Sequence, residues 1–172
     1  MLTEGELKET PNDALVQKVI SSVLEFVGEL SNGEDEYERV RQAPKSAQFF
    51  WAMRLLESEV NNGGFEQYFW NSSCTLVDIA LEAYQRIGAD TYVDFVQRAL
   101  AIMGSEPWAT RRRQFDGDWR TYKRACPPAL DELNNEFYAA RRGSPESGGQ
   151  DTSLYERKVE YIRQNYGAIS AS

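Results

Sequence analysis

The chain of 172 residues contains no histidine. Histidine is the most frequent general base in enzymes, the commonest metal ligand and the side chain that titrates near neutral pH. Its absence excludes serine–histidine and cysteine–histidine hydrolase mechanisms. The only cysteines, Cys74 and Cys126, stand in unrelated contexts without the spacing of metal ligands. We therefore expect two reduced thiols in a cytoplasmic protein that holds no metal and no cofactor.

Long apolar runs are missing as well. No stretch is long and apolar enough to span a membrane, and the first residues lack the basic and apolar regions of a signal peptide. Neither a strand pattern nor an internal repeat occurs. With 41% hydrophobic residues, a chain of this length suffices for one domain with a real core. The sequence predicts an all-α fold, a single compact helical domain of about seven to eight helices over residues 1–172.

Basic residues are outnumbered by acidic ones. The 27 acidic and 19 basic residues give a formal charge of −8. Through residue 110 the chain carries 18 acidic and 8 basic side chains, and from Arg111 onward it carries 9 and 11. An acidic excess argues against direct nucleic-acid binding and favours attraction to a basic protein.

Helical spacing of apolar residues locates the central elements. A segment from about Lys45 to Val60 is apolar around most of its circumference, so we expect a buried central helix. Two later segments that end at Gly88 and Gly104 predict a helical hairpin.

Polar and small residues mark the segments that we expect to lie outside the core. The acidic, polar residues 1–9 predict a mobile arm, and Thr10 and Pro11 then have the residue types that begin a helix. The glycine- and serine-rich residues 143–152 predict a flexible loop. Residues 168–172 predict a loose tail.

The densest run of carboxylates extends from Glu34 to Glu38. One interpretation is a solvated loop or the charged first turn of a second helix. The functional interpretation is an acidic patch that binds a partner, together with two glutamates on the solvent side of the preceding helix. We name these candidate partner-binding residues the acidic surface: Glu25, Glu29, Glu34, Asp35, Glu36 and Glu38.

Two adjacent glycines after two asparagines form the most unusual stretch, which we call the glycine corner, Asn61 to Gly64. Glycine and asparagine tolerate backbone conformations that other residues avoid, so we expect the central helix to end here. An aromatic segment, Phe65 to Trp70, follows and requires burial. Glu59 projects onto the apolar side of the central helix. We expect its carboxylate either to accept hydrogen bonds from the backbone amides of the corner or to turn toward solvent.

The corner also permits a second functional interpretation, a small-molecule or peptide-binding site. Amides of Asn61, Asn62, Gln67 and Asn71 would provide polar contacts, and Phe65, Tyr68 and Trp70 would provide apolar walls. A carboxylate-based enzyme is a third hypothesis, but no Asp or Glu pair has a distinguishing context. We therefore predict a protein that is not an enzyme and has no catalytic residues.

Three consecutive arginines, Arg111 to Arg113, form a compact basic cluster. A basic cluster of this kind binds phosphate or pairs with neighbouring carboxylates. In a chain this acidic, pairing with carboxylates is the favoured interpretation.

The corner and its flanks resemble a known family. The residues that carry the resemblance are Glu59, Val60, Asn61, Asn62, Gly63, Gly64, Phe65, Gln67, Tyr68, Phe69, Asn71 and Ser72, followed by Ala83, Ile87, Gly88 and Ala89. This pattern is similar to that of a bacterial DNA-mimic-protein family, also described as a domain of unknown function. The match is specific over roughly residues 46 to 103.

The resemblance implies an all-helical fold and a function in transcription regulation. The best-understood member of the family is an acidic dimer whose surface carboxylates imitate DNA phosphates and engage a DNA-binding transcription factor. By the resemblance, this chain is expected to be a homodimer that binds such a basic partner. The matching positions themselves have the character of fold-forming residues, so the binding function is expected on the acidic surface.

Overall fold

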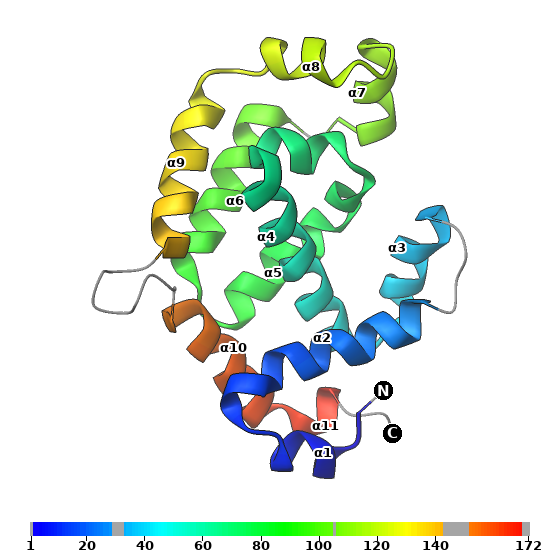
Figure 1. The fold of residues 1–172 in the computed structure, drawn as a ribbon, viewed down its shortest axis with the longest axis vertical. Helices are drawn as coiled ribbons and strands as arrows, with labels where there is room; N and C mark the ends of the chain where they lie inside the picture. The colour runs from blue at the N-terminus through cyan, green and yellow to red at the C-terminus, as the bar shows by residue number, and fades with distance from the viewer. Residues whose placement is uncertain (1, 29–32, 105, 143–151, 170–172) are drawn as a thin grey trace.

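The computed structural model describes residues 2–28, 33–104, 106–142 and 152–169, with only the backbone described at 27, 28, 33–36, 152 and 168. These residues form an all-helical fold, as predicted (Figure 1). The elements are α1 (Glu4–Glu9), α2 (Asn12–Gly28), α3 (Gly33–Gln42), α4 (Lys45–Trp70), the 3-10 helix η1 (Ser72–Leu76), α5 (Val77–Arg86), α6 (Asp90–Met103), α7 (Trp108–Gln114), α8 (Trp119–Ala125), α9 (Ala129–Arg142), α10 (Thr152–Gln164) and α11 (Tyr166–Ile169).

Helix α4 is the central helix that the sequence predicts. It contacts α2, α3, α5, α7, α9 and α11. Five consecutive residues that cover all its sides, Phe49 to Met53, are each 2% exposed or less. A helix that is apolar all round is buried all round, so α4 organises one continuous hydrophobic cluster.

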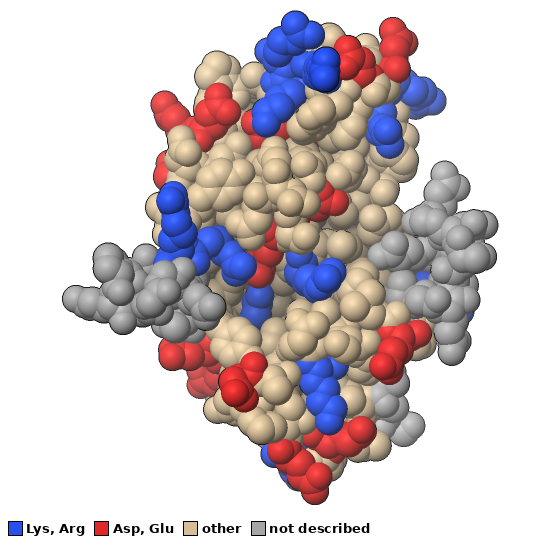
Figure 2. Space-filling view, in the orientation of Figure 1, with Lys and Arg blue, Asp and Glu red and all other residues tan. Residues whose placement is uncertain are grey.

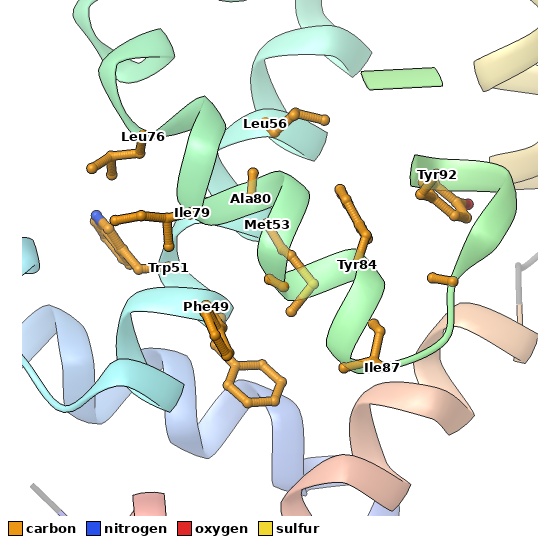
Figure 3. Packing of buried hydrophobic residues seen from close by; sticks show 14 of the residues in the cluster. Phe49, Trp51, Met53, Leu56, Leu76, Ile79, Ala80, Tyr84, Ile87 and Tyr92 are labelled. Atoms are coloured by element: carbon orange, nitrogen blue, oxygen red, sulfur yellow. The ribbon is translucent and has the colours of Figure 1, made fainter. Parts of the chain in front are cut away.

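Helix α5 of the predicted hairpin packs against α4, and α6 packs against α5 and α9. Leu56 and Met53 of α4 lie beside Ala80 and Tyr84 of α5 (Figure 3). The turn between α5 and α6 is closed by Gly88, whose φ of 68° is in the left-handed region that glycine adopts without strain. This turn brings Tyr84 and Tyr92 into a stacked pair with ring centroids 5.2 Å apart.

The N-terminal segment differs from the predicted mobile arm. Residues 4–9 form α1, which begins with a capping box between Thr3 and Glu6. Leu7 is fully buried, and Arg163 of α10 donates hydrogen bonds to the carbonyl oxygens of Leu7 and Thr10 at 2.8 and 2.6 Å. The composition of this segment is polar, but one buried leucine and a distant arginine are sufficient to dock it.

The C-terminal end also differs in part from the predicted tail. Residues 166–169 form α11, and Ile169 is 1% exposed against α1 and α4. Residues 170–172 of the predicted tail and 143–151 of the predicted loop lie outside the described residues. Among the helices of the described part of the chain, none combines the length and apolarity needed to cross a membrane.

Candidate functional site

The glycine corner divides α4 into two helical segments that meet at a bend. Gly63 and Gly64 have non-helical backbone angles, and the φ of Gly64 is +80°. The helix then resumes through the aromatic segment to Trp70. The amide of Phe65, which has lost its intrahelical partner at the bend, donates to Asn134 Oδ1 of α9 at 2.8 Å. The helix end predicted at the corner is therefore confirmed, and α9 supplies the acceptor for the first amide of the segment that follows.

Glu59 is hydrogen-bonded, but its partners differ from those expected. Its carboxylate accepts hydrogen bonds from Gln67 Nε2 at 2.7 Å, Asn71 Nδ2 at 2.9 Å and Ser73 Oγ at 3.5 Å. The expected backbone amides of the corner are not among these partners. The bend in α4 directs Gln67 and Asn71 toward Glu59. Their side-chain amides therefore occupy the positions where we expected backbone amides to bind the carboxylate.

The side chains proposed as walls of a ligand site fill the interior. Phe65 and Tyr68 are each 1% exposed, and Trp70 is 6% exposed. The ring of Phe65 meets Phe137 edge-on at 5.6 Å, and that of Trp70 stacks on Tyr122 at 4.6 Å. Phe69, the remaining aromatic side chain of the segment, is 4% exposed.

The amides proposed as ligand contacts divide into two pairs. Those of Gln67 and Asn71 are engaged by Glu59, whereas Asn61 and Asn62 are exposed. The structure therefore does not bring the four amides together around an opening. The corner is a bend between two helical segments, held by buried aromatic side chains and internal hydrogen bonds.

Sequence reasoning missed a buried charged cluster on the same helix. Glu57 is 7% exposed and accepts hydrogen bonds from Lys158 Nζ at 2.6 Å, Arg141 Nη1 at 3.0 Å and the Tyr84 hydroxyl at 3.2 Å. The pKa of Tyr84 is raised well above its usual value, mainly by burial and in addition by the negative charge of the nearby Glu57 carboxylate. The cluster joins α4, α5, α9 and α10. Its only sequence signal is that Glu57 follows Met53 by one helical turn on the apolar face.

A second buried carboxylate, Glu66, lies beside the bend. It is 2% exposed and accepts a hydrogen bond from Asn134 Nδ2 at 2.7 Å. Asn134 therefore serves both the Phe65 amide and the Glu66 carboxylate. No pattern in the sequence indicates this partner, which lies 68 residues farther along the chain.

Arg111 does not pair with a carboxylate as expected. It is 3% exposed, and its guanidinium donates to the carbonyl oxygens of Phe69 at 2.8 Å and Glu106 at 3.1 Å. It also lies over the Phe69 ring at 5.6 Å. A planar guanidinium has enough donors for several carbonyl groups at once, so Arg111 fixes the start of α7 to the end of α4.

The structure describes the side chains of two of the six residues of the acidic surface. Glu25 on α2 and Glu38 on α3 are both exposed. Glu29 lies outside the described residues, and Glu34, Asp35 and Glu36 occupy the first turn of α3 with only their backbone described. This placement matches the predicted charged first turn of a helix, where carboxylates are favoured by the helix dipole.

Two arginines of α3 contact neighbouring helices. Arg39 lies over the ring of Phe26 at 5.1 Å, which places the turn of Glu38 beside the turn of Glu25. Arg41 pairs with Asp78 of α5 at 3.2 Å. On the face of the molecule in Figure 2, acidic and basic side chains are interspersed.

The two cysteines are both free, as predicted. Burial raises the pKa of the Cys74 thiol to about 11 and also raises that of Cys126. Neither thiol therefore has the lowered pKa of a nucleophilic cysteine. Among the described residues, no group of His, Cys, Asp and Glu side chains has the arrangement of a metal site.

A family model, described as DMP19-like protein, matches residues 41–165. The chain belongs to this family. The matched span runs from α3 to α10. It contains the bend in α4, Glu59 with its side-chain partners, and the buried charged cluster around Glu57. The family is one of DNA-mimic proteins, which agrees with the resemblance carried by residues 59–72. A comparison with curated proteins and another with solved structures find no match.

Proposed function

We propose that this chain is a non-enzymatic interaction protein that binds a basic, DNA-binding protein through surface carboxylates that imitate DNA phosphates. The observation that carries the proposal is the family match, in a chain whose residues up to 110 carry 18 acidic and 8 basic side chains. A DNA-binding groove is lined with arginine and lysine, and carboxylates compete for these cations with phosphate groups.

The geometry of α2 and α3 supports a role for the acidic surface. Glu25 and Glu38 are exposed on neighbouring turns, and the cations of α3 that would otherwise neutralise them, Arg39 and Arg41, are directed to Phe26 and Asp78. The negative charge is thus left to solvent. We propose that Glu29, Glu34, Asp35 and Glu36 extend this surface.

The test is capture of partners by the immobilised chain from an extract of its own cells, at low and at physiological salt. The expected partner is a DNA-binding transcription regulator that is released by salt and by added duplex DNA. An E25Q/E38Q variant should capture less of it than an E132Q/E156Q variant, which removes the same charge from exposed positions elsewhere. A complex that resists both salt and duplex DNA would contradict the proposal.

We further propose that the chain forms a homodimer and acts in the cytoplasm. A DNA mimic must be in the same compartment as the DNA-binding protein that it binds. The two free thiols are also typical of a protein in a reducing compartment. Sedimentation analysis should give about twice the chain mass of 19.6 kDa. A single species at the chain mass over the micromolar range would contradict the dimer.

A further inference from the structure

Helices α7 and α8 form a basic end on an otherwise acidic molecule. Residues 108–125 contain six basic and two acidic side chains, in a chain of formal charge −8. The two helices lie at one end of the long axis, away from α1 and α11 (Figure 1). Lysine and arginine side chains gather at this end in the space-filling view (Figure 2).

Five of the six cations are exposed, and we call them the α7–α8 cations: Arg112, Arg113, Arg120, Lys123 and Arg124. The ion pairs found among the described residues include none of them. Of the two nearby acids, Asp118 caps α8 by accepting from Arg120 N at 2.9 Å and Thr121 Oγ1 at 2.6 Å. The positive charge of this end is therefore largely unneutralised.

A shallow apolar depression lies among these cations. It has a volume of about 420 Å³ and is lined by Trp119, Arg120, Lys123 and Arg124. Trp119 is half-buried, and its ring packs edge-on against Trp70 at 5.9 Å. Lys123 Nζ lies over the same ring at 5.7 Å. The Trp119 indole is thus packed against Trp70, and the flexible side chain of Lys123 lies over its ring.

We propose that the α7–α8 end binds a short acidic segment of a protein partner. One apolar or aromatic side chain of the segment enters the depression beside Trp119 and displaces the Lys123 side chain. Flanking carboxylates pair with the guanidinium groups of Arg120 and Arg124, which bind carboxylates in a bidentate manner, and with the ammonium group of Lys123. Charge complementarity and an aromatic anchor are the usual elements of such an interface.

A nucleic-acid strand fits this end less well than a short peptide. Helices α7 and α8 have seven residues each, and each is therefore only about 10 Å long. A strand of phosphates would extend beyond it over a chain with an acidic excess, where it would be repelled. At physiological salt, charges interact over about 8 Å, so a short acidic segment senses mainly the local cations.

The test uses a fluorescein-labelled acidic peptide, a run of glutamates with two central phenylalanines, and measures anisotropy against the full chain. An R120E/K123E variant should bind about tenfold more weakly than the unaltered chain. The matched control R86E/R142E reverses two exposed cations outside the α7–α8 cations and should bind within about twofold of the unaltered chain. Replacing the two phenylalanines by serine should also weaken binding several-fold.

Three results would overturn the proposal. These are equal loss of binding in both charge-reversal variants, tighter binding of an oligo-dT strand of equal charge than of the peptide, and no saturable binding by a chain with an unchanged circular-dichroism spectrum. Because the α7–α8 cations are separate from the acidic surface, each of these results leaves the proposed DNA-mimic function intact.

Discussion

The Glu59 carboxylate and the Gln67 amide lie 2.7 Å apart across the bend in α4. One hydrogen bond thus connects the two segments of a helix that two glycines interrupt. Asn71 donates to the same carboxylate oxygen at 2.9 Å. The residues that carry the family resemblance are therefore partners of one another, and their role is to hold the bend.

Replacing Glu59 by Gln should lower the free energy of unfolding by about 2 kcal/mol. A glutamine oxygen could still accept from Gln67 and Asn71, but both hydrogen bonds would lose the negative charge that strengthens them, and its NH2 group would replace the oxygen that accepts from Ser73. Denaturant unfolding measures the change, with E132Q on the exposed face of α9 as the control. Equal midpoints for E59Q and E132Q would show that the carboxylate does not hold the bend.

Gly64→Ala should be among the most destabilising single changes in the chain, at about 3 kcal/mol. The φ of Gly64 is +80°, and an added Cβ would collide with Glu66 and Asn134. Gly104 has a similar φ of +70° but nothing within 4 Å of an added Cβ, so Gly104→Ala should cost only the backbone strain, about 1–2 kcal/mol. Comparison of the two thermal midpoints separates crowding from backbone strain. Similar midpoints would argue against a crowded bend.

Lys158→Met should cost about 3 kcal/mol, because it removes one partner of a buried ion pair. The Lys158 ammonium is 2.6 Å from Glu57, and both residues are 7% exposed. The double variant E57Q/K158M should be less destabilised than the sum of its single variants. Strict additivity in this double-mutant cycle would mean that the two residues do not interact in solution.

Arg111→Lys should destabilise the chain by about 2 kcal/mol. A lysine has one ammonium group and cannot reproduce the separate hydrogen bonds from Arg111 to Phe69 and Glu106. The adjacent Arg112→Lys provides the matched control, since Arg112 is exposed. If both variants unfold at the same denaturant concentration, the buried guanidinium is not needed to anchor α7.

Stability should fall as pH rises from about 9 to about 11. The pKa of Cys74 is about 11 in the folded chain because of burial, against 9.0 for an ordinary thiol. The protonated thiol therefore stabilises the fold fully below pH 9, and this contribution is lost as pH rises through 11. The difference between the two pKa values makes this contribution to the free energy of unfolding at most about 3 kcal/mol.

The comparison of C74A with the unaltered chain isolates this contribution. Denaturant unfolding at a series of pH values should give C74A a shallower alkaline decline. The buried Tyr68 and Tyr84, whose pKa values are also raised by burial, leave a residual decline in both chains. Identical pH dependence of the two chains would contradict a buried, protonated Cys74.

Local sequence patterns are sufficient to predict most of the helices. The all-round apolarity near Phe50 predicts a central buried helix, and Gly88 predicts the turn of a hairpin; both are confirmed. These features depend on helical periodicity and on the backbone freedom of glycine, which act within a few residues. The composition of residues 1–9 does not predict the docked helix α1, because a single buried leucine has no periodic pattern.

What the sequence determined by itself is the helical class, the family and the acidic excess, since these depend on composition and on short-range spacing. Tertiary contacts alone account for the joining of the two segments of α4 at the bend, the binding of Glu59 to side-chain amides, the burial of Glu57 with Lys158, and the grouping of the α7–α8 cations at one end (Figure 1). Each of these depends on contacts between residues that are far apart in the chain or on opposite sides of a bend. The free energy of such contacts comes from burial and hydrogen bonding in the assembled core, which no local pattern contains.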